Sequence, residues 1–283
     1  MIIGADGQLG SDLVPALKNH NLFCLTYPEF DILKTDQVEE TLNALNPDIV
    51  INTAAYNRVD DGEEFPLDAF RLNALAVRDL ARMCSDRDTE LVHFSSDYVF
   101  DGRKRSPYTE EDSPSPLNVY GLTKLAGELF VRNLCRRYYI VRTSSLFGLA
   151  GCRGKGHNFV DLIIKRQEEG HPLRIVDDQR MTPTSTFELA ERIRALIETN
   201  AYGLYHLSSR GDCTWYEYAG EVFHLLGIAP DLSPINSGDY LARARRPAYS
   251  VLDNGKAART GVPEFSHWTE ALENFMRKKG YIG

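Results

Sequence analysis

The pair Tyr120 and Lys124 has the residue types and the spacing for acid catalysis at a carbonyl group. Residues four apart on a helix share one face, so an ammonium group at 124 can lie beside the phenol. Its positive charge favours the tyrosinate and lowers the pKa of the phenol, which lets Tyr120 give a proton to a carbonyl oxygen as hydride reaches the carbon.

A hydroxyl partner for this pair is offered by Ser95 and Ser96, at the end of a predicted strand. Successive strand residues point to opposite faces, so only one of the two hydroxyls can address a substrate. The alternative interpretation is a serine that caps a turn.

Gly4, Gly7 and Gly10 form a G-x-x-G-x-x-G motif between the first apolar run and the first predicted helix. The spacing allows a tight turn, bare backbone against a pyrophosphate and close packing of helix on strand. Glu29 or Asp31 could then hold the ribose hydroxyls. No Arg or Lys lies in residues 27–33, which favours NADH, although either nicotinamide coenzyme is compatible with the motif.

Alternating strands and helices must position these residues. In the first half, β-rich runs alternate with helical periodicity, as in βαβ units with a parallel sheet. Several strands are apolar on both faces, which predicts helices on both sides. We therefore expect an α/β fold with a Rossmann-type, doubly wound parallel sheet. The expected strands are 1–3, 22–27, 48–52, 90–94 and 138–142, and the expected helices are 8–19, 35–45, 66–85 and 118–137.

The pattern becomes less regular beyond residue 145. We expect residues 1–145 to form the dinucleotide-binding domain and residues 146–283 to form mainly a smaller C-terminal substrate-binding lobe, with some segments returning to the first domain. The lobe would close over the carboxyl edge of the sheet, where open α/β sheets bind ligands. Its expected strands are 173–176 and 204–207, and its expected helices are 159–169, 187–198, 215–226 and 268–278.

Composition restricts the class of partner. A net charge of −8 provides no basic field of the kind that attracts nucleic acid or anionic membranes. No apolar run approaches the roughly 20 residues of a membrane span, and no leader is visible, so we expect a cytoplasmic protein. We expect no metal site and reduced, buried thiols, because the cysteines show no ligand spacing. They are Cys24, Cys84, Cys135, Cys152 and Cys213.

Four segments together resemble the dTDP-4-dehydrorhamnose reductase family of extended short-chain dehydrogenases/reductases. They are residues 4–10, 52–60, 95–102 and 118–128, with further likeness at 142–144, 178–179, 183–184 and 246–247. The resemblance implies reduction of the 4-keto group of dTDP-4-dehydro-L-rhamnose to dTDP-L-rhamnose, with NADH or NADPH as coenzyme. It implies a nucleotide-sugar substrate and leaves a homodimer open.

The resemblance also implies roles for single residues. The catalytic set would be Ser96, Tyr120 and Lys124. The coenzyme would contact Gly4, Gly7, Gln8, Leu9, Gly10, Asp31, Ile32, Ala54, Ala55, Tyr56, Tyr120 and Lys124. The substrate would contact Val59, Ser96, Asp97, Tyr98, Tyr120 and Arg246.

Two features depart from the family pattern. Ser145 stands where members commonly carry a tryptophan beside the sugar, so a large apolar contact would be missing. This favours, as an alternative, a ketoreductase for another dTDP-deoxysugar. Only residues 1–3 precede Gly4, which is short for the central strand of such a sheet, so we expect a trimmed N-terminus or a weakened sheet centre.

The same residues bear on three other classes of protein. Asp97 is followed by Tyr98 rather than by a second acid, which argues against a dehydratase. An epimerase would keep its coenzyme bound through the cycle. A non-catalytic regulatory subunit resembling the beta subunit of methionine adenosyltransferase would act by binding a partner chain.

Overall fold

The computed structural model describes residues 1–151 and 156–283, and its main feature is a six-stranded parallel sheet. The strand order is β2, β1, β3, β4, β5 and β10. The order reverses between β1 and β3, which is where open α/β sheets bind ligands. The expected Rossmann-type, doubly wound sheet is confirmed. The strands are β1 (Ile2–Ile3), β2 (Cys24–Leu25), β3 (Ile49–Asn52), β4 (Glu90–Ser96), β5 (Tyr138–Thr143) and β10 (Gly203–His206).

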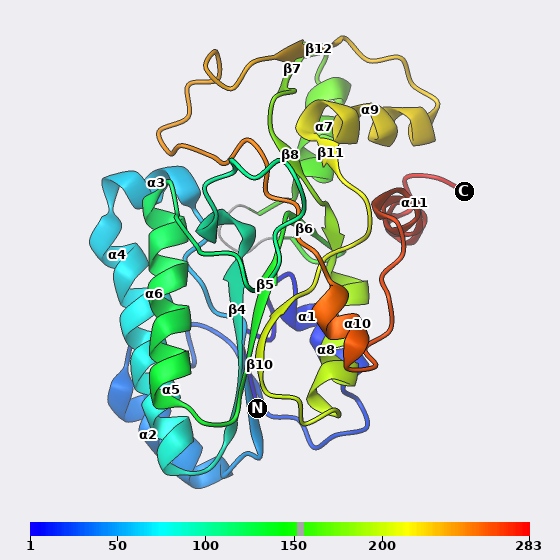
Figure 1. Ribbon diagram of the computed structural model, residues 1–283. Helices are drawn as coiled ribbons and strands as arrows, with labels where there is room; N and C mark the ends of the chain where they lie inside the picture. The colour runs from blue at the N-terminus through cyan, green and yellow to red at the C-terminus, as the bar shows by residue number, and fades with distance from the viewer. Residues whose placement is uncertain (152–155) are drawn as a thin grey trace.

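Helices cover both faces of this sheet because both sets of alternating strand side chains are apolar (Figure 1). On one face, Val50, Leu91 and Ile140 pack against α2 (Thr35–Leu45), α5 (Ala76–Asp86) and α6 (Val119–Leu134). On the other face, Ile51, Val92 and Val141 pack against α1 (Gly10–Ala16) and α8 (Thr186–Ile197).

The helix expected over residues 66–85 is divided into three parts. These are α4 (Pro66–Phe70), a π-helical turn η1 (Arg71–Leu75) and α5, preceded by a short helix α3 (Val59–Glu64). Asn73 lies in the π turn with no exposed surface, and its side chain binds the backbone of another segment. Helical periodicity predicts the whole stretch but carries no signal for such a turn.

Two expectations about the N-terminal strands are wrong. β1 is not a central strand, because it lies next to the edge strand β2. Its length of two residues therefore shortens the sheet near the edge and not at the centre. Cys24 lies on that edge strand and is exposed, whereas Cys84, Cys135 and Cys213 are buried. All four are free thiols, and Cys152 lies outside the described residues.

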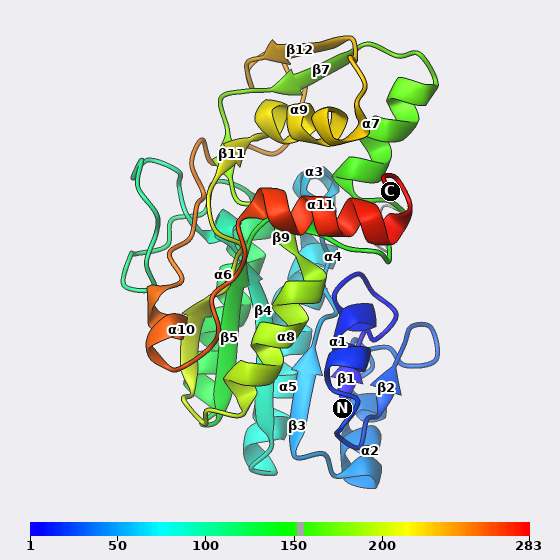
Figure 2. The same cartoon turned by 90° about the vertical axis from the view of Figure 1, so that its right-hand side faces the viewer.

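Residues after β5 build a second layer of structure around a separate aromatic core of Phe147, Tyr218, Phe223, Trp268 and Phe275. Figure 2 shows β7, β12, α7 and α9 grouped at the end of the molecule opposite the N-terminus. The paired strands are β6 (Leu146–Phe147) with β9 (Thr184–Ser185), β7 (Leu173–Val176) with β12 (Leu232–Ile235), and β8 (Arg180–Met181) with β11 (Cys213–Thr214). The remaining elements are η2 (Asp97–Val99), α7 (Phe159–Glu168), α9 (Trp215–Leu226), α10 (Gly255–Arg259) and α11 (Trp268–Lys279).

The chain after residue 145 therefore contributes to both layers, because β10 and α8 belong to the large sheet and its helical cover. A domain boundary at residue 145 stays a prediction. Within the described ranges, no helix is both long and apolar enough to cross a membrane.

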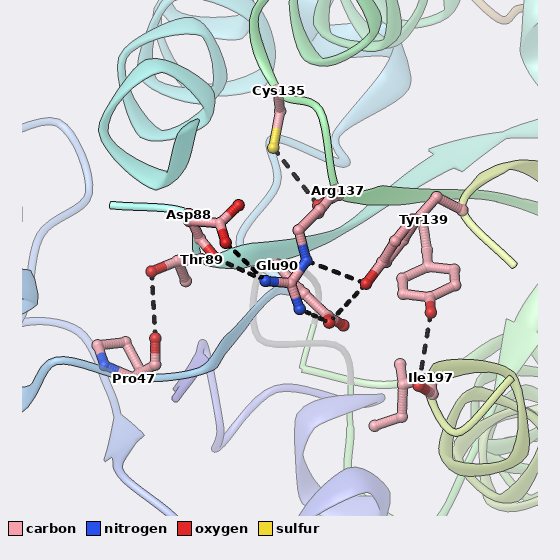
Figure 3. A network of polar contacts seen from close by, with 9 residues as sticks. Pro47, Asp88, Thr89, Glu90, Cys135, Arg137, Tyr139 and Ile197 are labelled. Carbon is pink, nitrogen blue, oxygen red and sulfur yellow. Dashed lines mark hydrogen bonds and ion pairs between the residues drawn. The ribbon is translucent and has the colours of Figure 1, made fainter. Parts of the chain in front are cut away.

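A polar network closes the amino end of the sheet (Figure 3). Arg137, just before β5, forms an ion pair with Glu90 on β4 and donates to the hydroxyl of Tyr202 at 3.0 Å. The same arginine pairs with Asp88 at 3.1 Å, and Tyr202 donates to Glu90 at 2.8 Å. The network ties β4, β5 and the start of β10 together at the end of the strands that lies away from the ligand edge.

Candidate active site

The loop after β1 is shaped by its three glycines. Gly4 has a φ of +77°, and a Cβ there would lie 2.7 Å from the Thr53 hydroxyl. Thr53, which follows β3, shares its single hydroxyl hydrogen between the carbonyls of Ile3 and Gly4, at 2.8 and 3.0 Å. A Cβ on Gly10 would lie 2.2 Å from the Gly4 carbonyl oxygen, so only glycine lets α1 start this close to the loop. The glycines thus let α1 begin directly after β1 at the switch point.

The other predicted coenzyme residues near this loop lie along the same edge. Gln8 donates to the carbonyl of Leu146 at 3.1 Å and so links the loop to β6. The side chains of Leu9 and Ile32 are buried in the two sheet cores, so only their backbones are available to a ligand. Asp31 is half-buried, and its carboxylate accepts from the amide of Leu33 at 3.0 Å.

Residues after β3 are connected to α6 through Asn73. The amide of Tyr56 donates to Asn73 Oδ1 at 2.8 Å, and Asn73 Nδ2 donates to the Tyr56 carbonyl and to Thr123 Oγ1, both at 3.0 Å. Thr123 in turn donates to the carbonyl of Tyr120 at 2.8 Å. The segment of Ala54, Ala55 and Tyr56 is therefore fixed relative to the helix turn that carries Tyr120.

The start of α6 is capped from three directions. Asn118 accepts from the amide of Gly121 at 2.7 Å and donates to the carbonyl of Arg245, also at 2.7 Å. Glu63 on α3 accepts from the amide of Val119 at 2.8 Å. The bonds to Asn118 Oδ1 and to Glu63 satisfy amides that have no partner inside the helix, and the bond to Arg245 holds the capping side chain. They hold the first turn, and with it half-buried Tyr120, in one place.

Lys124 lies one turn after Tyr120 and is 3% exposed. Burial lowers the pKa of its ammonium group to about 8, against the charge of Glu128, which raises it. Glu128 accepts two hydrogen bonds from Arg142 on β5, at 2.8 and 2.7 Å, and both side chains are almost fully buried. This bidentate pair anchors α6 to the sheet just beyond the Tyr120 and Lys124 pair.

The end of β4 separates the two serines. Ser96 accepts from the amide of Tyr98 at 3.1 Å and donates to Asp97 Oδ1 at 2.9 Å. The hydroxyl of Ser95 is buried and has no hydrogen-bond partner among residues 1–151 and 156–283. The ring of Tyr98 lies edge-on to the ring of Tyr120, with 6.0 Å between centroids, so the Ser96 segment lies beside Tyr120. Asp97 is 2% exposed.

A segment from the C-terminal half reaches the same edge. Arg246 donates to Asp60 on α3 at 2.7 Å, and Asp60 also accepts from the amide of Ala244 at 3.0 Å. Arg246 also hydrogen bonds with Tyr98. Val59, half-buried, begins α3 next to Asp60. The structure therefore groups Val59, Tyr98 and Arg246 around α3.

Three features of this site are not predicted by the sequence. Asn73 is one of several polar residues in the helical stretch over 66–85, and its spacing gives no signal. Glu128 could have been noticed four residues after Lys124, on the same helix face. The pairing of Asp60 with Arg246 joins residues 186 positions apart, which no local pattern predicts.

The glycine loop fits a dinucleotide pyrophosphate, since its three glycines carry no side chain and lead directly into the amino terminus of α1 at the switch point. A phenol, an ammonium group and a serine hydroxyl lie on the same sheet edge. This fold and this site define an oxidoreductase of the short-chain dehydrogenase/reductase class.

Comparison with known proteins gives the family. The model of the RmlD substrate binding domain matches residues 1–280. A dTDP-4-keto-6-deoxy-D-glucose reductase of Streptomyces niveus is 37% identical over 276 residues, covering 96% of this chain and 94% of that protein. A dTDP-4-dehydrorhamnose reductase of Escherichia coli is 34% identical over 299 residues, covering 98% and 97%.

A solved structure agrees with these relatives. The dTDP-4-dehydrorhamnose reductase of Bacillus anthracis, crystallised with NADP, is 35% identical and superposes with a TM-score of 0.92 over 98% of both chains. The chain belongs to the RmlD family, that of the dTDP-4-dehydrorhamnose reductases.

Proposed function

We propose that the protein reduces the 4-keto group of dTDP-4-dehydro-L-rhamnose to dTDP-L-rhamnose with NADH or NADPH. The observation that carries this proposal is the capped first turn of α6, which presents Tyr120 and Lys124 beside the Ser96 segment. Membership of the family over residues 1–280 supports the choice of a dTDP-sugar.

The chain's own residues would protonate the keto oxygen. When bound, the reduced nicotinamide supplies the hydride. Tyr120 gives its phenolic proton to the oxygen, and the ammonium group of Lys124 stabilises the tyrosinate that remains. The hydroxyl of Ser96 contacts the same oxygen, where negative charge develops.

Three stretches would hold the coenzyme. The bare backbone of Gly4, Gly7 and Gly10, with Gln8 and Leu9 between, would meet the pyrophosphate. Asp31 and Ile32 would flank the adenosine, and Ala54 to Tyr56 would line the inner side. The preference for NADH stays a prediction, and the Bacillus anthracis relative was crystallised with NADP.

The substrate side would be formed by Val59, Tyr98 and Arg246, on the segments that meet at α3. A guanidinium group suits a diphosphate because its donors match phosphate oxygens. Arg246 is already held by Asp60, so it is oriented before the substrate arrives.

A direct spectrophotometric assay tests this function. Purified protein is mixed with dTDP-4-dehydro-L-rhamnose and NADPH, then NADH, and the loss of reduced nicotinamide is followed by absorbance while the product is identified by mass spectrometry. We expect dTDP-L-rhamnose in equal amount to the coenzyme consumed. Consumption of neither coenzyme would overturn the proposal.

A second substrate is favoured by one residue. Ser145, half-buried with a φ of +45°, follows Ser144 at the end of β5 and presents only a small side chain. The Streptomyces niveus relative is named for reduction of dTDP-4-keto-6-deoxy-D-glucose. Comparing kcat/KM for the two keto sugars decides between them.

The remaining expectations need separate experiments. A cytoplasmic location and a homodimer stay predictions, which cell fractionation and light scattering would check. Copurification with a methionine adenosyltransferase, together with an inactive protein, would favour the regulatory-subunit alternative. Tightly bound nicotinamide and no turnover of added coenzyme would favour an epimerase.

A further inference from the structure

The carboxyl group of Asp97 is enclosed by serine hydroxyls from three separate segments. Ser96 on β4 donates to Oδ1 at 2.9 Å, and Ser144, just after β5, donates to Oδ2 at 3.0 Å. Ser250, in the segment that follows Arg246, is a third hydrogen-bond partner. The side chain is 2% exposed, so neutral dipoles take the place of water around it.

These surroundings move the pKa of the Asp97 carboxyl group toward neutral pH. Burial raises the pKa of its carboxyl group to about 6, because the three hydroxyls offset only part of the cost of removing the charge from water. The elements packed around it carry ionisable side chains from β4, η2, α6, β5 and the segment that contains Ser250: His93, Tyr98, Tyr120, Lys124, Glu128, Arg142, Arg246 and Tyr249.

The number of hydrogens on Ser96 then becomes important. A serine hydroxyl has one hydrogen to donate and two lone pairs to accept with. One lone pair of Ser96 takes the amide of Tyr98 at 3.1 Å. While Asp97 is ionised it can only accept, so the single hydrogen of Ser96 is directed at Asp97. Ser96 can then only accept a hydrogen bond from a ligand, whereas a keto oxygen needs a hydrogen-bond donor.

The neutral carboxyl group reverses this bond. A protonated Asp97 can donate its own hydrogen to Ser96 Oγ, which fills the second lone pair of Ser96. The hydrogen of Ser96 is then available to another acceptor. One proton on Asp97 therefore changes what Ser96 offers, without any movement of the chain.

We propose that Asp97 is a positioning residue that acts through Ser96: neutral Asp97 directs the Ser96 hydrogen to the keto oxygen of the substrate, and ionised Asp97 withdraws it. The inference rests on the proposed reductase function and adds a proton-dependent control to it. No substrate bond is formed or broken by Asp97, because the proton that reaches the keto oxygen still comes from Tyr120. Asp97 keeps its proton throughout turnover.

The test is a pH profile of kcat/KM for reduction by wild type, Asp97→Asn and Ser144→Ala. Wild type should lose up to about tenfold in kcat/KM for each pH unit above a midpoint near 6. Asparagine can donate to Ser96 permanently through Nδ2, so Asp97→Asn should remain active and show no transition near that pH. Ser144→Ala removes a bond that favours the ionised form, so the midpoint should move to higher pH.

The matched control is Asp101→Asn, which changes a second aspartate four positions along the chain. Asp101 accepts from the hydroxyl of Tyr108 at 3.1 Å and is not part of the site. Its profile should follow that of wild type. A readout independent of turnover is the infrared band of the protonated carboxyl group, which should disappear through the same pH range in wild type and be missing in Asp97→Asn.

The outcomes separate the two proposals. An active wild type whose pH profile is unchanged in Asp97→Asn overturns the role of Asp97 alone, as does a folded Asp97→Asn protein that is inactive at every pH. A wild type that consumes neither coenzyme at any pH overturns the reductase function and, with it, the role of Ser96.

Discussion

Tyr120 and Lys124 lie one turn apart at the start of α6, and their surroundings differ strongly. Tyr120 is half-buried, whereas Lys124 is 3% exposed with a pKa lowered by burial to about 8. The charge of Glu128 favours the ammonium form, and Arg142 holds Glu128 in place. At the residue scale, a charged lysine is thus maintained where the proposed mechanism leaves a tyrosinate.

Replacing Tyr120 by phenylalanine removes the only atom that differs between the two rings, the hydroxyl. We expect kcat for reduction to fall about 10²- to 10⁴-fold, since the general acid is lost. The affinity for NADPH, measured by fluorescence titration, should change less than about twofold, because most predicted coenzyme contacts lie elsewhere. A variant with near wild-type kcat would remove Tyr120 from the mechanism.

The raised pKa of Asp97 also predicts how stability changes with pH. The folded state holds the proton up to a pH of about 6, whereas the unfolded chain releases it near the ordinary value of 3.8. Between these values the folded state binds more protons, so the free energy of unfolding of wild type falls as pH rises.

Asp97→Asn removes this dependence. Its free energy of unfolding relative to wild type should increase by ~2 kcal/mol from about pH 4 to about pH 7, measured by urea denaturation at each pH. A difference that is constant over this range would show that the carboxyl group has an ordinary pKa in the folded protein.

At the scale of elements, the site depends on how closely α6 approaches the end of β4. Gly121 is the contact point, since a Cβ there would lie 2.1 Å from the carbonyl oxygen of Tyr98. Gly127, farther along the helix, also lies close to the π turn, because a Cβ there would be 2.5 Å from the carbonyl oxygen of Asn73. Two glycines thus let α6 lie against η2 and η1.

Gly121→Ala should therefore move the first turn of α6 away from η2. Displacing a catalytic group by about 1 Å can cost 10²-fold, so we expect kcat to fall by roughly 10- to 100-fold. The matched control is Gly220→Ala in α9, where a Cβ would meet no atom within 4 Å. That variant should keep its kcat and gain up to ~1 kcal/mol in stability by thermal denaturation. Equal activity in both variants would contradict this account of α6.

On the scale of the whole molecule, the site is completed by a segment from the C-terminal half. Residues 243–246 reach α3 through the ion pairs of Arg246 with Asp60 and of Arg243 with Glu64. The two pairs differ in environment, because Arg246 is 18% exposed and Arg243 is 61% exposed. Only the first is sheltered enough to orient a side chain.

Asp60→Asn should therefore raise KM for the nucleotide sugar by roughly 3- to 10-fold, corresponding to about 1 kcal/mol for a partly sheltered ion pair. KM for NADPH should stay the same, because the predicted coenzyme contacts lie at the switch point. Glu64→Gln, which breaks the exposed pair, is the control and should change neither constant. An equal rise in both KM values would mean that Asp60 supports the fold rather than the substrate side.

The sequence by itself determined the features that depend on neighbouring residues. Local periodicity predicts the strands and helices of the first half. Local spacing likewise shows the glycine motif and the pair of Tyr120 and Lys124. The resemblance of whole segments added the family, which the comparisons confirm. The position of the helix over 66–85 was predicted, but its division into three parts was not, because a π turn depends on what Asn73 binds.

Only the tertiary structure decided which distant groups meet. It placed β1 beside the edge strand, distinguished Ser96 from Ser95, and brought Ser144 and Ser250 to Asp97. These contacts join segments up to about 150 positions apart. Strand order and loop path set them, and neither leaves a periodic signal in the chain. The pKa of Asp97 follows from the same contacts, because burial and hydrogen bonding exist only in the folded protein.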